Sequence, residues 1–225
     1  GTLSLDGSLS GAGGLTKVGS GTLTLGGVND FSGGVTLNDG ALAIGNNEAT
    51  GTGTLTLNAG TVLPTGGDWT VSSAVEVVGP TTIYFPESPG NDLTFSGPTH
   101  LSGGPTLNFT HTSGLRRFSG TITLDCDLTI TGTHNGGALT MNGGLETRGV
   151  NRTLNFNDAS TTADTFSGTL TGTASTIILA GANNNVRIGS LTGGTAHAIE
   201  INAPCIFTFN GTAGDYTGGT WINGA

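Results

Sequence analysis

The sequence predicts an all-β solenoid, specifically a right-handed parallel β-helix of about seven to ten coils in which residues 1–225 form a single segment. Three observations support this prediction. The composition is rich in strand and turn formers, short strand-like runs recur along the chain, and a longer unit of similar sequence repeats with loops of variable length.

The composition favours many short strands joined by tight turns. The 225 residues include 42 Gly and 40 Thr but one Lys and no Gln, so several strong helix formers are nearly absent. Gly supplies turn conformations, whereas Thr, Val and Ile favour the pleated surface of a strand. The net charge of −9 would repel a phosphate backbone, so we expect no nucleic-acid partner. We also expect no membrane insertion, because no run reaches the roughly 18 apolar residues of a spanning helix.

Strand-like alternation appears in runs of only three to four residues. Gly, Asn and Asp separate these runs, as in Asn38-Asp39-Gly40, and such residues tolerate the left-handed conformation of tight turns. The clearest runs are residues 22–25, 35–37, 41–44, 54–57, 121–124, 128–130 and 198–201.

A longer unit joins a strand, a polar loop, an aromatic residue followed by Ser or Thr and Gly, and a second strand. Weaker copies of this unit occupy residues 106–124, 153–171 and 206–224. Their spacing predicts coils of roughly 24 residues, although a different spacing near the start leaves the coil length open. We expect Phe31, Phe118 and Phe166 at equivalent turns, and the loops 110–117, 157–165 and 210–215 along one edge. An antiparallel β-sandwich is the rival fold.

The segment from Gly19 to Val62 resembles the autotransporter-associated β-strand repeat of bacterial surface proteins. The resemblance rests on two GTLTL strands, an aromatic-Ser-Gly-Gly turn and an Asn-Asp-Gly turn, at residues 21–25, 53–57, 31–34 and 38–40. A weaker copy lies at residues 216–224. The resemblance implies a passenger-type β-helix displayed outside a bacterial cell, often within a much longer polypeptide.

The two ends of the chain predict an assembly interface. Joining residues 216–225 to residues 1–5 would regenerate the order of strands and turns seen at residues 31–44. An uncapped β-helix exposes unpaired backbone groups that another coil can bind. We therefore expect other copies stacked head to tail, or flanking repeats of a longer chain, as partners. The predicted interface comprises Gly1, Thr2, Leu3, Leu5, Tyr216, Trp221 and Ile222.

One basic pair, Arg116 and Arg117, precedes Phe118. It predicts either a solvated loop or a surface that contacts an acidic glycan or another copy, and the solvated loop is the simpler interpretation.

The remaining polar residues indicate no enzyme chemistry, and we expect no catalytic residue, cofactor or metal site. Asp125 and Asp127 flank Cys126 in an alternating run that should point both carboxylates outward, where a Ca²⁺ site would lack sufficient oxygen ligands. Cys126 and Cys205 should be buried free thiols. The four histidines, at positions 100, 111, 134 and 197, show no metal-ligand spacing and are expected to be solvated or in turns.

These observations favour a structural extracellular module, either a rigid surface stalk or a subunit of a fibre. The alternative is a glycan-binding adhesin, for which Trp69, Tyr84 and Trp221 are the aromatic residues to test. A polysaccharide lyase or hydrolase would need clustered carboxylates that the sequence does not indicate.

Overall fold

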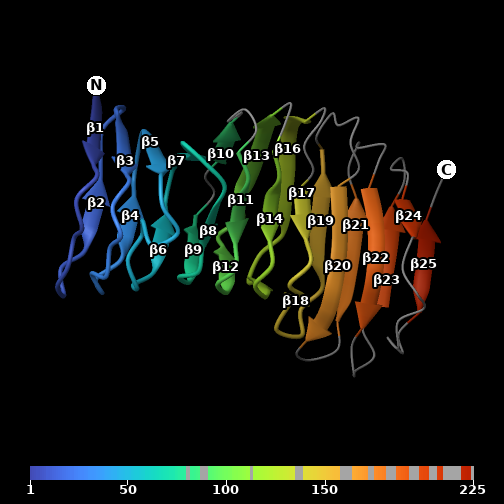
Figure 1. The fold of residues 1–225 in the computed structure, drawn as a ribbon. Coiled ribbons are helices and arrows are strands. Elements are labelled where there is room, and N and C mark those ends of the chain that lie inside the picture. Colours follow the sequence, from blue (N-terminus) through green and yellow to red (C-terminus); the bar gives the residue numbers. More distant parts are fainter. Residues whose placement is uncertain are drawn as a thin grey trace.

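The protein is a parallel β-solenoid whose coils stack along one axis, with β1 and β25 at opposite ends (Figure 1). The computed structural model describes residues 1–79, 82–86, 91–111, 114–134, 139–157, 164–171, 175–180, 186–192, 198–202, 207–209 and 219–223. Every strand pair in these ranges is parallel, and these ranges contain no helix, which confirms the all-β solenoid and excludes the antiparallel sandwich.

The first face of the solenoid is a sheet of eleven strands within the described residues. Ten coil steps separate these strands, within the predicted range. The strands are β1 (Thr2–Leu5), β3 (Thr22–Leu25), β5 (Ala41–Ile44), β7 (Gly60–Pro64), β10 (Thr82–Pro86), β13 (Thr106–His111), β16 (Leu128–His134), β19 (Arg152–Phe156), β21 (Thr176–Ala180), β23 (Ala198–Asn202) and β25 (Thr220–Asn223).

Two further faces belong to one fourteen-stranded sheet and are joined by the long strand β20 (Asp164–Thr171). The second face contains β2 (Leu15–Lys17), β4 (Val35–Leu37), β6 (Leu55–Leu57), β9 (Val75–Val78), β12 (Thr99–Ser102), β15 (Ile122–Leu124) and β18 (Leu145–Glu146). The third face contains β8 (Trp69–Val71), β11 (Leu93–Phe95), β14 (Arg116–Phe118), β17 (Leu139–Met141), β22 (Val186–Thr192) and β24 (Phe207–Phe209).

Coil length changes along the chain. Ala41 lies opposite Thr61, 20 residues on, whereas Thr106 lies opposite Thr129, 23 residues on. The longer coils begin where β8 adds a strand on the third face. The predicted coil of roughly 24 residues therefore fits the middle of the chain, and the first coils are shorter.

Side chains at alternate positions of each strand point into the solenoid, and together they form its core. Leu23, Leu42 and Val62 form one such column on the first face, in register from coil to coil. Farther along, Phe85 stacks on Phe109 with ring centroids 4.8 Å apart. The predicted inward Leu, Ile and Val residues make up most of the described core, whereas Val18, Val28, Val78 and Val150 are exposed.

The aromatic-Ser-Gly unit marks the corner between the third and second faces. Phe95 and Phe118 end successive strands and stack with ring centroids 5.0 Å apart. The Ser119 N–H then donates to the Phe95 carbonyl, 2.8 Å away. A Cβ on Gly120 would overlap the Gly97 carbonyl oxygen of the preceding coil. Glycine is therefore required at this corner by the close stacking of two coils.

The predicted turn positions of the aromatic residues need correction. Phe31 lies outside the strands, just before a bend at residues 32–33, but Phe118 and Phe166 lie in strands of the third face, in one column with Met141 between them. The alternation of inward and outward side chains continues through the aromatic residue at the end of the strand, so its ring faces inward.

The predicted variable loops at residues 110–117 and 157–165 make the same connection between faces, although residues 112–113 and 158–163 lie outside the described residues. The chain passes from the first to the third face between β13 and β14 and again between β19 and β20. Residues 210–215 lie outside the described residues and follow β24, which is on the third face. The copy of the repeated unit at residues 206–224 therefore begins on the third face, whereas the copies at residues 106–124 and 153–171 begin on the first face.

Asn and Asp side chains continue the coil-to-coil hydrogen bonds through the corners. A side-chain oxygen accepts the backbone N–H of the following coil, which would otherwise lack a strand partner. This contact joins Asn47 to Thr70, Asp68 to Asp92, Asp92 to Leu115, Asp127 to Thr153, and Asn151 to Thr176, at 2.7 to 2.9 Å.

Candidate functional site

The end of the solenoid at β1 is an uncovered stacking face. Leu3 lies on the inward column above Leu23, yet it is 59% exposed because no described coil lies on its other side. A hollow of about 440 Å³ opens here, and four predicted interface residues line it: Gly1, Thr2, Leu3 and Leu5. The remaining lining residues come from β2, β3 and the residues beside them. The structure therefore brings the N-terminal part of the predicted interface into one apolar surface.

The C-terminal part of the predicted interface lies at the other end of the first sheet. The backbones of Trp221 and Ile222 belong to β25 and pair with Glu200 and Ile201 of β23. Tyr216 lies outside the described residues, as do the side chains of Trp221 and Ile222. The two parts thus flank the stack at opposite ends.

Lys17 is a feature of the stacking face that sequence reasoning missed. Its position on β2 is inward, in register with Leu37, and its side chain is nearly buried. The Lys17 side chain bends toward the end of β2, where its ammonium group donates to the carbonyls of Val18, Gly19 and Asp39. These three acceptors satisfy the cation, so a charged residue can occupy an inward strand position.

The prediction for Arg116 as a loop or surface residue is wrong. Arg116 begins β14 and points inward, where it is fully buried. Its Nη1 donates to the carbonyls of Asn91 and Leu115, both 3.0 Å away. Burial lowers the pKa of Arg116 to about 10, although the negative charge of Asp92 opposes this effect.

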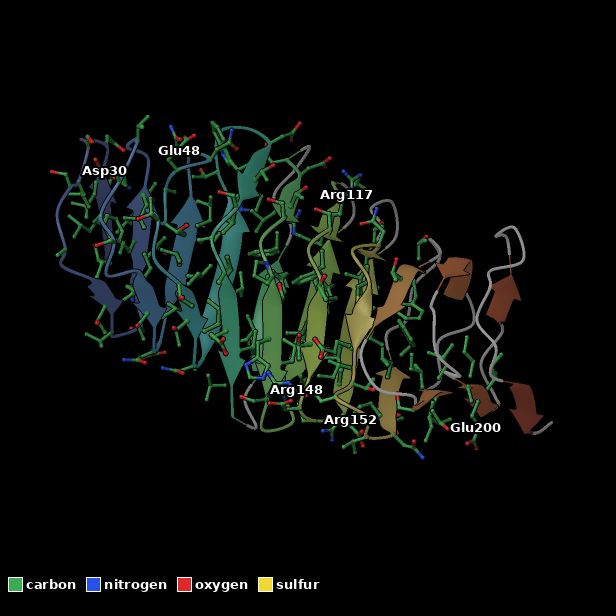
Figure 2. The ribbon with its side chains drawn as sticks, turned by 90° about the horizontal axis from the view of Figure 1, so that it is seen from below. Asp30, Glu48, Arg117, Arg148, Arg152 and Glu200 are labelled. Atoms are coloured by element: carbon green, nitrogen blue, oxygen red, sulfur yellow. The ribbon has the colours of Figure 1, made fainter. Side chains whose placement is uncertain are left out.

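Arg117 points to the opposite side of the strand, as alternation requires. It lies in register between Thr94 and Thr140 on the outside of the third face. Figure 2 shows Arg117 on the opposite side of the molecule from Arg148 and Arg152. The arginine pair is therefore divided, and only Arg117 is available for a surface contact.

The alternating strand predicted around Asp125 and Asp127 ends at Leu124, so Cys126 lies at a corner. Asp127 accepts the Thr153 N–H, as described above. Asp125 instead contacts His100 and Arg148 on the outside of the second face. Among the described residues, no group of three or more His, Cys, Asp or Glu side chains could hold a metal ion.

Cys126 is a free thiol, but it is half-buried rather than fully buried as predicted. Partial burial raises the pKa of the Cys126 thiol, so the less nucleophilic protonated form is favoured. Cys205 lies outside the described residues.

The aromatic residues proposed for glycan contact have different environments. Trp69 packs partly against the core, and its Nε1 donates to the Thr65 carbonyl at 2.8 Å, so its ring has a structural role. Tyr84 is 48% exposed on the first face and lies between Thr61 and Asn108. Tyr84 is therefore the accessible one of these two rings.

The stacked parallel strands define the protein as a β-solenoid of the repeat class. Residues 15–44 match the family model described as Passenger-associated-transport-repeat, which confirms the resemblance to a bacterial passenger repeat. No curated protein and no solved structure gave a significant match. In the described residues no helix is long and apolar enough to cross a membrane.

The matched segment corresponds to two pairs of neighbouring strands. It contains β2 and β4, which pair on the second face, and β3 and β5, which pair on the first. The repeat thus includes both partners of each ladder, so a single copy carries the contacts between adjacent coils. The match covers residues 15–44, so it shows one passenger-type repeat within the β-solenoid.

Proposed function

We propose that this chain is a rigid structural segment displayed outside a bacterial cell, where stacked coils form a stalk or a fibre. The observation that carries the proposal is the stack of parallel coils, in which the inward column of β1 continues through Leu23 and Leu42 into the core. The proposal assigns no catalytic activity and no cofactor. Its supporting features are the in-register parallel ladders and the passenger-repeat match.

A further coil placed on β1 would pair its free backbone edge and cover Leu3. Burial of one leucine side chain contributes about 1.5 to 3 kcal/mol, before the cost of ordering the added coil. A flanking repeat of a longer chain could supply that coil. A second copy could also supply it, because β25 lies at the opposite end of the same sheet. Such a head-to-tail contact does not close and therefore extends into a fibre.

Leu3→Glu is expected to weaken association of the isolated chain, because a charge would enter an apolar stacking face. Sedimentation velocity over a wide concentration range, with electron microscopy, should show association of the unmodified chain. The dissociation constant should rise at least about tenfold in the variant, which corresponds to 1.4 kcal/mol.

Val28→Glu is the matched control, since Val28 is similarly exposed at 60% but does not line the stacking hollow. This variant should associate like the unmodified chain. A monomer at every concentration, without filaments, would contradict self-assembly and leave stacking by flanking repeats.

Duplication of residues 35–54 tests whether the solenoid lengthens coil by coil. Val35 lies opposite Leu55 and Ala41 opposite Thr61, so this insert restores both registers. We expect a folded chain with a higher free energy of unfolding and a rod longer by about 4.8 Å in small-angle scattering. A shorter duplication, of residues 35–48, cannot restore the register and should destabilise the chain. Equal stability of the two insertions would contradict coil-by-coil extension.

A glycan-binding adhesin is the second candidate, favoured by the exposed ring of Tyr84, which lies in register with Asn108 and Thr61 on the outside of the first face. Aromatic rings bind the apolar faces of sugars, and amide or hydroxyl groups bind their polar edges. Loss of glycan-array signal in Tyr84→Ala would support this function. Absence of signal in the unmodified chain would exclude it for the glycans tested.

A further inference from the structure

A row of charged side chains runs along the outside of the second face, with one residue from each of four successive coils. Glu76 comes from β9 and His100 from β12, and these two residues lie in register. Asp125 follows β15, and Arg148 follows β18. The charges of the carboxylates, the arginine and a protonated histidine alternate in sign along the row. The row therefore links coils through side chains as well as through the backbone.

His100 contacts a carboxylate on each side. Its Nδ1 is 2.8 Å from Oε2 of Glu76, and its Nε2 is 2.8 Å from Oδ2 of Asp125. A neutral imidazole has a single N–H, whereas the protonated ring has two. Both contacts can be hydrogen bonds to ionised carboxylates only when His100 carries both protons. Arg148 also donates to Oδ2 of Asp125, at 3.1 Å.

The surroundings of His100 favour its charged form. Partial burial by itself would lower the pKa of His100, but the hydrogen bonds to Asp125 and Glu76, together with their negative charges, raise it above 6.5. On β15 the residue directly opposite is the neutral Thr123, and Glu146 of β18 lies one coil beyond it. The other residues of β12 itself carry no charge.

We propose that His100 is a proton-controlled clasp that joins three successive coils in the middle of the solenoid. Loss of one proton leaves a ring nitrogen lone pair facing a carboxylate oxygen, and no cation then separates Glu76 from Asp125. One hydrogen bond between coils becomes a repulsive contact, so the stack loosens there. Because the folded pKa is raised, the stabilisation is complete below the unfolded value of 6.5 and is lost as pH rises through the folded pKa.

In the first coils, the corresponding outward positions of the second face hold threonine instead of charged residues. In the coils nearer the N-terminus, the outward positions in register with Glu76 hold Thr56, Thr36 and Thr16, which do not titrate. Loosening at higher pH should therefore be local to the middle coils, and the first coils provide an internal reference.

Histidine NMR titration and urea unfolding of the full chain from about pH 6 to about pH 9 test the clasp. We expect the pKa of His100 above 6.5, and a rise in the unfolding constant of up to about tenfold per pH unit between 6.5 and that pKa. His100→Asn should remove this part of the pH dependence, which separates it from titration of the other histidines. Hydrogen exchange should accelerate with pH beyond the intrinsic rate in β12 and β15, but not in β4 and β6.

Glu76→Gln should shift the pKa of His100 downward, since one charged partner is removed. Glu146→Gln is the matched control. Glu146 also points outward on the second face, but it lies in register with Thr123 and one coil farther from His100. This variant should leave the pKa of His100 unchanged. A pKa of His100 at or below 6.5, or an equal pH dependence in the unmodified chain and His100→Asn, would overturn the proposal. The NMR titration of Glu76→Gln decides the question if His100→Asn does not fold.

Discussion

Phe85→Ala is expected to lower the free energy of unfolding by about 3 to 5 kcal/mol. Phe85 is 1% exposed and stacks on Phe109, and its ring also meets Phe95 and Phe118 edge-on at 5.9 and 6.3 Å. The substitution removes buried area, leaves a cavity in a closely stacked interior and deletes three aromatic contacts. Urea unfolding followed by fluorescence or circular dichroism measures the loss.

Tyr84→Ala is the adjacent control on the same strand. Tyr84 points outward and is about half exposed, so its truncation should change the free energy of unfolding by no more than about 0.5 kcal/mol. Similar losses for the two variants would show that the inward and outward positions of β10 are assigned incorrectly.

Gly120→Ala is expected to cost about 3 kcal/mol, at the upper end of the range for overpacking. The added methyl group would overlap the backbone carbonyl of Gly97, which cannot move away as a flexible side chain could. Gly97 and Gly143 stand at the same corner in adjacent coils and meet the preceding coil in the same way. One alanine should therefore push neighbouring coils apart and disturb several stacked layers.

Gly7→Ala is the matched control for this corner. A Cβ on Gly7 meets no atom within 4 Å, so the substitution should leave the free energy of unfolding within about 0.5 kcal/mol. Thermal and urea unfolding of both variants would distinguish steric overlap from a general intolerance of alanine. A stable Gly120→Ala variant would contradict the close stacking at this corner.

The sequence by itself determined the local features of this protein. Alternation predicted the strands at residues 22–25, 35–37 and 41–44 with their observed bounds, because inward and outward side chains differ in polarity. The recurring aromatic-Ser-Gly unit predicted stacked coils, since each coil repeats the same corner. The segment at residues 15–44 carried enough of this pattern to match a known passenger repeat.

Only the tertiary structure decided which distant residues meet. The contacts of His100 with Glu76 and Asp125 span 24 and 25 residues, so they depend on a coil length that varies along the chain. The orientation of Arg116 depends on where the loop ends and the strand begins, because a shift of one residue exchanges the inward and outward sides. A long cationic side chain favours a prediction of exposure, whereas two carbonyl acceptors at a neighbouring corner allow its burial. Local patterns thus specify each coil, and the register between coils specifies its chemistry.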